Sequence, residues 1–357
     1  VQGLANTAWS LAKLCLADCP LLAALSAQAL RKISAAGPQN LSNLAWAFAR
    51  LMISDRPLRK AISSAARNTL HLFPPQELTN TAWAWATLCV DDMPLLASIS
   101  SQAIPKRPAF AAQNLANTVW SYAQRGICDG PLLPAISSAS IRRLVDFTDQ
   151  HLANTAWAFA ALAVEHRPLL DAIASSAIPR ISDFAAQGLA NTAWSWASLT
   201  IRNAPLLDAI SSSSLPTITQ YSPQHLANTS WSCATLQFAD APLRAAIAAA
   251  ALRSIRHFSA QHLSATSWAF AALQFRHLTL LAAISEASIA TCSEANAQDL
   301  GNTAWAFATL RLRDAPLLDA IASAAIPTSP SPGGLGATAF PAQGLAMIAW
   351  SVAALEV

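Results

Sequence analysis

The chain has 357 residues, of which 54% are hydrophobic and 11% are charged, and its formal net charge is +3. No stretch approaches the roughly 18 consecutive apolar residues of a membrane-spanning helix, and the high hydrophobic fraction is the opposite of a disordered composition. The composition therefore predicts a folded protein that buries many small residues and has no membrane partner.

A tryptophan recurs along the whole chain and defines its organisation. It occurs nine times at a spacing of 37 residues, and a tenth copy follows after 45 residues, giving Trp9, Trp46, Trp83, Trp120, Trp157, Trp194, Trp231, Trp268, Trp305 and Trp350. A Gln seven residues before the Trp and a Leu five before it are present in all ten copies, and an Asn three before it is present in eight. Self-similarity at such a period is typical of stacked helical repeats.

Each repeat is expected to contain two helices. The first, named the A helix, surrounds the Trp, and its apolar, mostly small residues fall on one face with the Trp at the edge supplying a large buried area. The second, named the B helix, begins near a Pro eleven residues after the Trp, from Pro20 to Pro316, usually behind an Asp or Asn. Pro in a first turn behind such a cap is a helix-start signal. Later prolines often end the B helix, namely Pro105, Pro179, Pro216 and Pro327.

The sequence predicts an all-α fold, an α-solenoid (superhelix) of about ten 37-residue helix-turn-helix repeats, because one helix pair cannot bury both of its faces without neighbours. Residues 1–327 form nine helical pairs, residues 328–340 a Ser/Pro/Gly-rich inserted loop, and residues 341–357 the first helix of a tenth, truncated repeat. Since the chain begins inside a motif and ends on an A helix, we expect an excerpt of a longer array whose targeting segment, if any, lies outside it.

Two columns of the A helix vary in residue type from repeat to repeat, six residues before the Trp and four residues after it. Hydrogen-bonding side chains in such columns suit the edges of bases, although they also suit a solvated surface. The base-reading candidates of the first column are Asn40, Glu77, Asn114, His151, His225, His262 and Asp299. Those of the second column are Lys13, Arg50, Thr87, Gln124, Ser198, Thr235 and Thr309.

The recurring Gln and Asn lie one helical turn apart and point the same way. They either form a ladder that satisfies backbone groups between repeats or contact the backbone of a ligand.

Basic residues cluster near the end of the B helix. Cations there are favourable without any ligand, and the alternative is contact with RNA phosphates. The backbone candidates are Arg31, Lys32, Lys106, Arg107, Arg142, Arg143 and Arg180. Residues 1–180 carry a net charge of +5 and residues 181–357 a net charge of −2, so the N-terminal half is expected to hold an RNA backbone more strongly.

The sequence offers little support for catalysis. There is no phosphate-binding loop, dinucleotide fingerprint or nucleophile elbow. His151, His225 and His262 lie on different repeats, and the six cysteines form no paired zinc motif. We therefore expect no enzyme activity, no catalytic residue, no metal, no cofactor and no small-molecule substrate.

The string Gln-x-Leu-Ala-Asn-Thr-Ala-Trp-Ala-Phe-Ala, followed by Pro-Leu-Leu, resembles the octotricopeptide repeat family over nearly the whole chain. The resemblance implies a sequence-specific single-stranded RNA-binding protein of chloroplasts or mitochondria that acts in RNA processing, stability or translation, with one repeat for each nucleotide. The chain departs from that family in its slightly shorter period, in Ala265 and Met347 at the Asn position, and in the long last junction. These departures put repeats eight and ten in doubt as binding units.

A protein- or peptide-binding solenoid without nucleic-acid contact is the alternative, and other proteins are possible partners in either case. In armadillo-like solenoids the Trp precedes its Asn by a turn, whereas here the Asn precedes the Trp. The order disfavours a direct analogy, while the nearly neutral charge leaves the alternative open.

Overall fold

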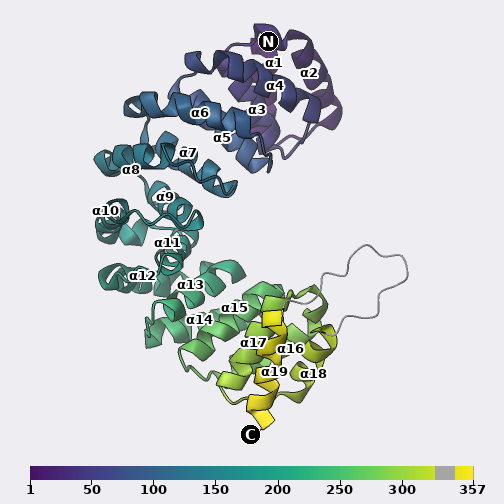
Figure 1. Cartoon of the computed structure of the whole chain (residues 1–357), viewed down its shortest axis with the longest axis vertical. Coiled ribbons are helices and arrows are strands. Elements are labelled where there is room, and N and C mark those ends of the chain that lie inside the picture. Colours follow the sequence, from purple (N-terminus) through teal and green to yellow (C-terminus); the bar gives the residue numbers. More distant parts are fainter. Residues whose placement is uncertain (326–341, 357) are drawn as a thin grey trace. The chain divides into compact units, whose positions relative to one another are not determined.

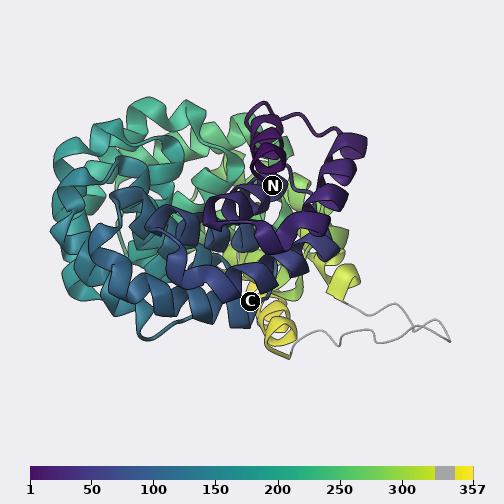
Figure 2. The same cartoon turned by 90° about the horizontal axis from the view of Figure 1, so that it is seen from above.

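The computed structural model describes residues 1–325 and 342–356, which form helices and no β-strand. The chain divides into two compact units, Val1–Arg180 and Ile181–Val357, and each unit is a stack of A and B helix pairs (Figure 1). Figure 2 shows the same chain from above, with the colours of Figure 1. The predicted all-α solenoid is confirmed, whereas the predicted loop at 328–340 lies outside the described residues.

The first unit holds five helix pairs. Its A helices are α1 (Gln2–Lys13), α3 (Pro38–Arg50), α5 (Pro75–Thr87), α7 (Ala112–Gln124) and α9 (Asp149–Ala161). Its B helices are α2 (Cys19–Lys32), α4 (Arg56–Thr69), α6 (Met93–Lys106), α8 (Leu132–Arg142) and α10 (Arg167–Ala177).

The second unit continues the same pattern. Its A helices are α11 (Ala186–Ser198), α13 (Pro223–Thr235), α15 (Ala260–Ala272), α17 (Ala297–Thr309) and α19 (Ala342–Glu356). Its B helices are α12 (Ala204–Thr217), α14 (Ala241–Ser254), α16 (Leu278–Ala290) and α18 (Ala315–Ala325). None of the described helices has the length and apolar character needed to cross a membrane.

Short 3₁₀ helices follow the B helices and lead into the next A helix. They are η1 (Ile33–Ala35), η2 (Leu70–Leu72), η3 (Arg107–Ala109), η4 (Leu144–Asp146), η5 (Ile178–Asp183), η6 (Ile218–Gln220), η7 (Ile255–His257) and η8 (Cys292–Glu294). Pro105 and Pro216 lie inside the last turns of α6 and α12, so these two prolines mark the ends of the B helices without stopping them at once.

Within each unit, neighbouring A helices pack more closely than neighbouring B helices. Small side chains make this possible. Ala8 and Ala82 are fully buried, and the hydroxyl oxygens of Thr79 and Thr118 lie 3.1 Å apart between α5 and α7. Because helices on the inner side of a curved stack must be closer together, the A helices form the inner layer of each unit.

The largest buried side chains are not the repeat tryptophans. Trp85 and Trp196, two residues after a repeat Trp, are almost completely buried. By contrast, Trp9 is 40% exposed and Trp350 is 53% exposed, and the other repeat tryptophans are half-buried. The internal repeat tryptophans therefore bury part of their surface at the edge of the apolar face, and the most completely buried indole rings are those of Trp85 and Trp196.

The predicted caps at the start of the B helices are confirmed. The carboxylate of Asp55 accepts a hydrogen bond from the Leu58 backbone N–H at 2.9 Å, and Asp92 accepts one from Leu95 at 3.1 Å. A proline occupies the first turn behind both caps. Local chemistry therefore fixes where each B helix begins.

A left-handed residue ends most A helices, six positions after the repeat Trp. In the first unit, Cys15, Met52, Cys89 and Ala163 have φ between 53° and 55°, and Gly126 has a φ of 64°. This conformation lets the next N–H bond back to the helix. The turn into the B helix thus depends on a backbone shape that costs energy in every residue except glycine.

Candidate nucleic-acid interface

One narrow stripe of each A helix carries the Gln, the Asn, the Trp and the residue four positions after the Trp. We name it the amide–Trp stripe. Among the described copies the Gln is exposed, the Asn is half-buried or exposed, and none of these side-chain amides has a hydrogen-bond partner among the described residues. Of the two roles considered for the Gln and Asn, the ladder between repeats has no hydrogen bond among the described residues. The stripe instead presents amide groups with free hydrogen-bonding capacity.

The repeat tryptophans form ladders along this stripe. In the first unit, the ring centroids of Trp9 and Trp46 are 6.3 Å apart, and those of Trp46 and Trp83 are also 6.3 Å apart. In the second unit, Trp268 and Trp305 stack at 6.3 Å with their planes 30° apart. Partly exposed aromatic rings at regular intervals are suitable platforms for stacking unpaired bases.

The residue four positions after the Trp lies on the amide–Trp stripe, and long, exposed polar side chains occupy this position only in the N-terminal repeats. Lys13 Nζ lies 5.2 Å from the ring centroid of Trp9 and 5.6 Å from that of Trp46. Arg50 and Gln124 are exposed. The remaining predicted residues of this column are half-buried, namely Thr87, Ser198, Thr235 and Thr309. The hydroxyls of Thr87 and Thr235 are buried without a hydrogen-bond partner, which leaves them poorly placed for contact with a ligand.

The column six residues before the Trp has a different role. It occupies the third position of the A helix, and at Asn114, His151, His225, His262 and Asp299 the side chain turns back to accept a hydrogen bond from the backbone N–H of the capping residue. Asn114 accepts from Ala111 at 3.0 Å, and Asp299 accepts from Asn296 at 3.4 Å. Asn40 and Glu77 are half-buried in the same column. At Asp299 the bond is reciprocal, because the Asn296 side chain accepts from the Asp299 N–H, and the pair forms a capping box. At Asn114 the bond runs one way, because Ala111 has no polar side chain.

The three histidines of this column have the same arrangement. His151 Nδ1 accepts from the Thr148 N–H at 3.3 Å, and the ring lies edge-on to Phe147. His225 and His262 repeat these bonds and pack edge-on against an aromatic ring four residues earlier. Burial lowers the pKa of all three imidazoles below the ordinary value, which favours the neutral form that can accept a hydrogen bond.

Four of the seven predicted phosphate contacts already have partners within the protein. Lys106 Nζ donates to the backbone carbonyls of His71 and Phe73, both at 2.7 Å. Arg143 donates to the carbonyl of Pro108, and the other two also bond to carbonyls, namely Arg107 with Ile104 and Arg180 with Ser176 and Leu144. These cations tie B-helix ends to nearby carbonyls, and three of them reach the preceding repeat.

The remaining predicted cations are available to solvent. Arg31, Lys32 and Arg142 are exposed and have no hydrogen bond or ion pair among the described residues. They lie at the ends of α2 and α8, at the edge of the first unit where the A helices begin.

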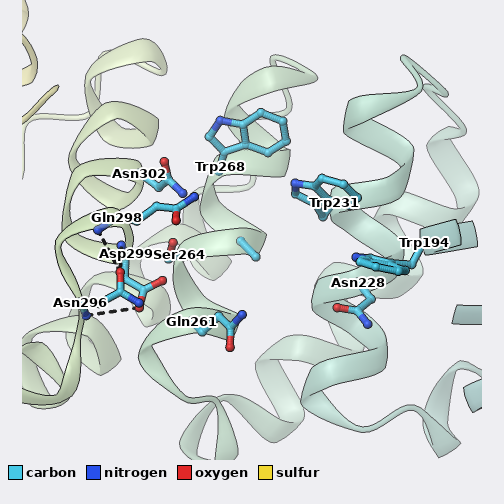
Figure 3. A pocket seen from close by; sticks show the side chains of 11 residues that line it. Trp194, Asn228, Trp231, Gln261, Ser264, Trp268, Asn296, Gln298, Asp299 and Asn302 are labelled. Atoms are coloured by element: carbon cyan, nitrogen blue, oxygen red, sulfur yellow. Dashed lines mark hydrogen bonds between the residues drawn. The ribbon is translucent and has the colours of Figure 1, made fainter. Parts of the chain in front are cut away.

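A pocket of about 390 Å³ opens on the amide–Trp stripe of the second unit (Figure 3). It is lined by Trp194, Asn228, Trp231, Gln261, Ser264, Ala265, Trp268, Asn296, Gln298, Asp299 and Asn302. Ala265 is the residue that stands at the Asn position of repeat eight. The repeat whose sequence departs from the pattern therefore contributes to the pocket.

No group of three or more His, Cys, Asp or Glu side chains that could hold a metal ion occurs among residues 1–325 and 342–356. His151, His225 and His262 lie on separate A helices, as the sequence indicates.

Comparison with known protein families identifies the family of this chain. The model of a family described as RNA-editing substrate-binding complex 6 protein matches residues 73–315. This segment is more than half of the chain. The chain belongs to that family. The matched segment contains the pocket and most of the amide–Trp stripe, and it connects the helical repeat architecture with RNA. The finer resemblance to octotricopeptide repeats remains a prediction.

Other comparisons add little to this family assignment. No characterised protein sequence matches the chain significantly. Among structures, a homology model of the full-length AP-3 complex in an intermediate open conformation is similar, with a TM-score of 0.28 and 9% identity. The match covers 87% of this chain and 66% of that chain, just under two thirds of its length. A likeness this weak supports no argument about function.

Proposed function

We propose that this protein binds single-stranded RNA along the amide–Trp stripes of its A helices, as a non-catalytic component of an RNA-editing assembly. The observation that supports this most directly is the pairing of partly exposed Trp rings with Asn and Gln amides that have no protein partner. The family's description as an RNA-editing substrate-binding complex protein points to the same class of ligand.

The chemistry of the stripe favours unpaired strands over a duplex. A base in a duplex has its faces covered by its neighbours, whereas an unpaired base can stack on an aromatic side chain and offer its edge. A carboxamide can donate and accept hydrogen bonds, so it can meet the edge of any base. The stripe thus provides both a stacking surface and groups that contact base edges.

Base reading is proposed for the amide columns together with Lys13, Arg50 and Gln124. The described Gln side chains, Lys13, Arg50 and Gln124 are exposed on the stripe, and most of the Asn side chains are half-buried there. Lys13 also lies over two Trp rings. In the predicted column six residues before the Trp, the side chains of Asn114, His151, His225, His262 and Asp299 are bonded to helix caps. In this proposal Asn114 and the three histidines support the stripe and contact RNA less, whereas Asp299 keeps Oδ1 without a hydrogen-bond partner among the described residues and lines the pocket.

Phosphate contacts are proposed for Arg31, Lys32 and Arg142. These exposed cations, unlike Lys106 and Arg180, have no carbonyl partners. Since contacts with phosphates release counterions, binding should weaken as salt rises.

An organellar location, in a mitochondrion or chloroplast, belongs to the same proposal. The RNA-editing description of the family and the resemblance to organellar repeat proteins support it. Protein partners are also expected for a member of a complex. No enzymatic step, cofactor or small-molecule substrate is part of the proposal.

The test is fluorescence anisotropy with labelled single-stranded RNA of mixed sequence, the corresponding RNA duplex and single-stranded DNA, over a series of salt concentrations. The double variant Asn80→Ala, Asn117→Ala removes two stripe amides, and Asn68→Ala removes an exposed amide from α4 in the B layer. We expect tighter binding to single strands and a severalfold loss with the stripe variant alone. Equal affinity for the two variants, or no RNA binding by the unaltered chain, would reject the proposal in favour of a protein-binding scaffold.

A further inference from the structure

We propose that the pocket beside Ala265 holds one base of the bound RNA strand and that its lining selects guanine. This inference rests on the proposed function and deepens it, since it assigns a defined subsite within the stripe. It concerns residues of α13, α15 and α17, with Trp194 from α11 at one end.

The space arises from a missing side chain. Repeats seven and nine carry Asn228 and Asn302 at the Asn position, and both line the pocket, whereas repeat eight has only the methyl group of Ala265 between them. The resulting volume, about 390 Å³, falls in the range of roughly 300–1,000 Å³ that is usual for ligand sites. The departure from the repeat pattern therefore makes room for a group of ligand size.

Three Trp side chains line this pocket. Figure 3 shows Trp194, Trp231 and Trp268, which line the pocket from three successive A helices, α11, α13 and α15. Trp268 stacks with Trp305 on one side, whereas Trp231 forms no ring contact with any other aromatic residue of the described chain. An inserted base can therefore stack on a Trp ring here without displacing a protein side chain from it.

The polar lining suits the edge of a base. Asn228, Gln261, Gln298 and Asn302 have side-chain amides without hydrogen-bond partners in the described chain. The side-chain oxygen of Asn296 is already engaged, because it accepts from the N–H groups of Gln298 and Asp299, both at 2.9 Å. Four amides can thus donate to or accept from a base held by the Trp walls.

Asp299 determines which base is favoured. Its side chain lines the pocket and the residue is only 8% exposed. One carboxylate oxygen, Oδ2, accepts from the Asn296 N–H at 3.4 Å, and Oδ1 has no hydrogen-bond partner among the described residues. A carboxylate accepts hydrogen bonds but cannot donate them, and its negative charge repels phosphate. The site therefore fits a base edge that is rich in N–H donors.

Guanine has such an edge. Its N1–H and its amino group lie side by side, so they can donate together to a carboxylate, while an amide donates to its O6. Adenine and cytosine place a ring acceptor beside their single amino group, and uracil places its N–H between two carbonyls. Each of these would set an acceptor against the carboxylate of Asp299, which accounts for the proposed selectivity.

The experiment compares base preferences in a selection from a short randomised RNA pool, with the sequences retained by each protein read out by position. Ala265→Asn restores the side chain that eight other repeats carry and fills the pocket without introducing a foreign residue. Ala249→Asn, at an exposed position of α14 in the B layer, is the matched control. Asp299→Asn replaces the carboxylate by the amide that caps the equivalent position at Asn114.

The unaltered chain and Ala249→Asn are expected to enrich guanine at one position. Ala265→Asn should reduce that enrichment on the order of tenfold and leave the other positions unchanged, and Asp299→Asn should weaken the preference for guanine at the same position alone. The melting temperature of each variant verifies that it is folded. Unchanged profiles in both variants, or enrichment of another base by the unaltered chain, would overturn the guanine pocket while leaving RNA binding intact. A failure of the unaltered chain to retain any RNA would instead reject the proposed function itself.

Discussion

Ser26 and Asp55 connect two consecutive repeats through a hydrogen bond of 2.5 Å from the serine hydroxyl to Oδ2 of the carboxylate. The other oxygen of Asp55 accepts from the backbone N–H of Leu58 and caps α4. One carboxylate therefore starts a helix and fastens it to the preceding B helix. Ser63 and Asp92 repeat the arrangement at 2.5 Å, so the stacking of the first unit depends on recurring polar clamps.

Removal of this clamp is expected to destabilise the first unit. Ser26→Ala should lower the free energy of unfolding by about 1–3 kcal/mol, because it deletes a hydrogen bond to a charged group and leaves one carboxylate oxygen without its partner. Urea denaturation followed by circular dichroism measures this. Ser101→Ala, which removes an exposed hydroxyl bonded only to its own helix, should be nearly neutral, and equal losses for the two variants would contradict the prediction.

The left-handed turns allow a prediction with a matched pair. Ala163 and Gly126 occupy equivalent turns, with φ of 53° and 64°. A left-handed conformation costs a residue with a side chain roughly 1–2 kcal/mol, so Ala163→Gly should stabilise the chain by about 1 kcal/mol and Gly126→Ala should destabilise it similarly. Thermal melting measures both, and shifts in the same direction for the two variants would disprove the argument.

The two tryptophans of α5 provide a direct test of orientation. Trp85 is 2% exposed, so Trp85→Ala is expected to cost about 3–5 kcal/mol. Trp83 is half-buried and stacks on Trp46, so Trp83→Ala should cost clearly less stability and should weaken binding to single-stranded RNA. Denaturation and anisotropy on the same samples separate the effects. A larger stability loss at Trp83 would show that the repeat Trp is mainly a core residue.

These residues also show what the sequence can and cannot reveal. The period of the Trp and the Asp–Pro starts predicted the helix pairs correctly, because both signals are local. The direction of the repeat Trp could not be predicted, since a residue at the edge of an apolar face can turn either way. The capping role of His151 left a signal in Thr148, three residues earlier, whereas the partners of Lys106 lie 33 and 35 residues away and left none.

His225 should make stability depend on pH. Burial lowers the pKa of its imidazole in the folded chain, so the unfolded chain binds a proton more readily, and stability falls as the pH drops from above 7 through the ordinary histidine range. Protonation of Nδ1 also removes the acceptor for the Ser222 N–H. Melting temperatures from pH 7.5 to 5.5 should fall less for His225→Asn, which caps without titrating, than for the unaltered chain. Identical slopes would show that this imidazole does not couple to folding.

Variants of Arg142 and Lys106 should distinguish a cation that contacts RNA phosphates from one that stabilises the fold. Arg142 is exposed at the end of α8 and has no partner in the described chain, so Arg142→Ala should leave melting unchanged. It should also reduce the dependence of log Kd on log salt by about 0.7 if one phosphate contact is lost. Lys106 bonds two carbonyls of the preceding repeat, and Lys106→Ala should therefore lower the melting temperature. Because Arg142 has no partner in the described chain, a change in the salt slope would report a lost phosphate contact. An unchanged salt slope in Arg142→Ala would show that this residue does not contact the RNA.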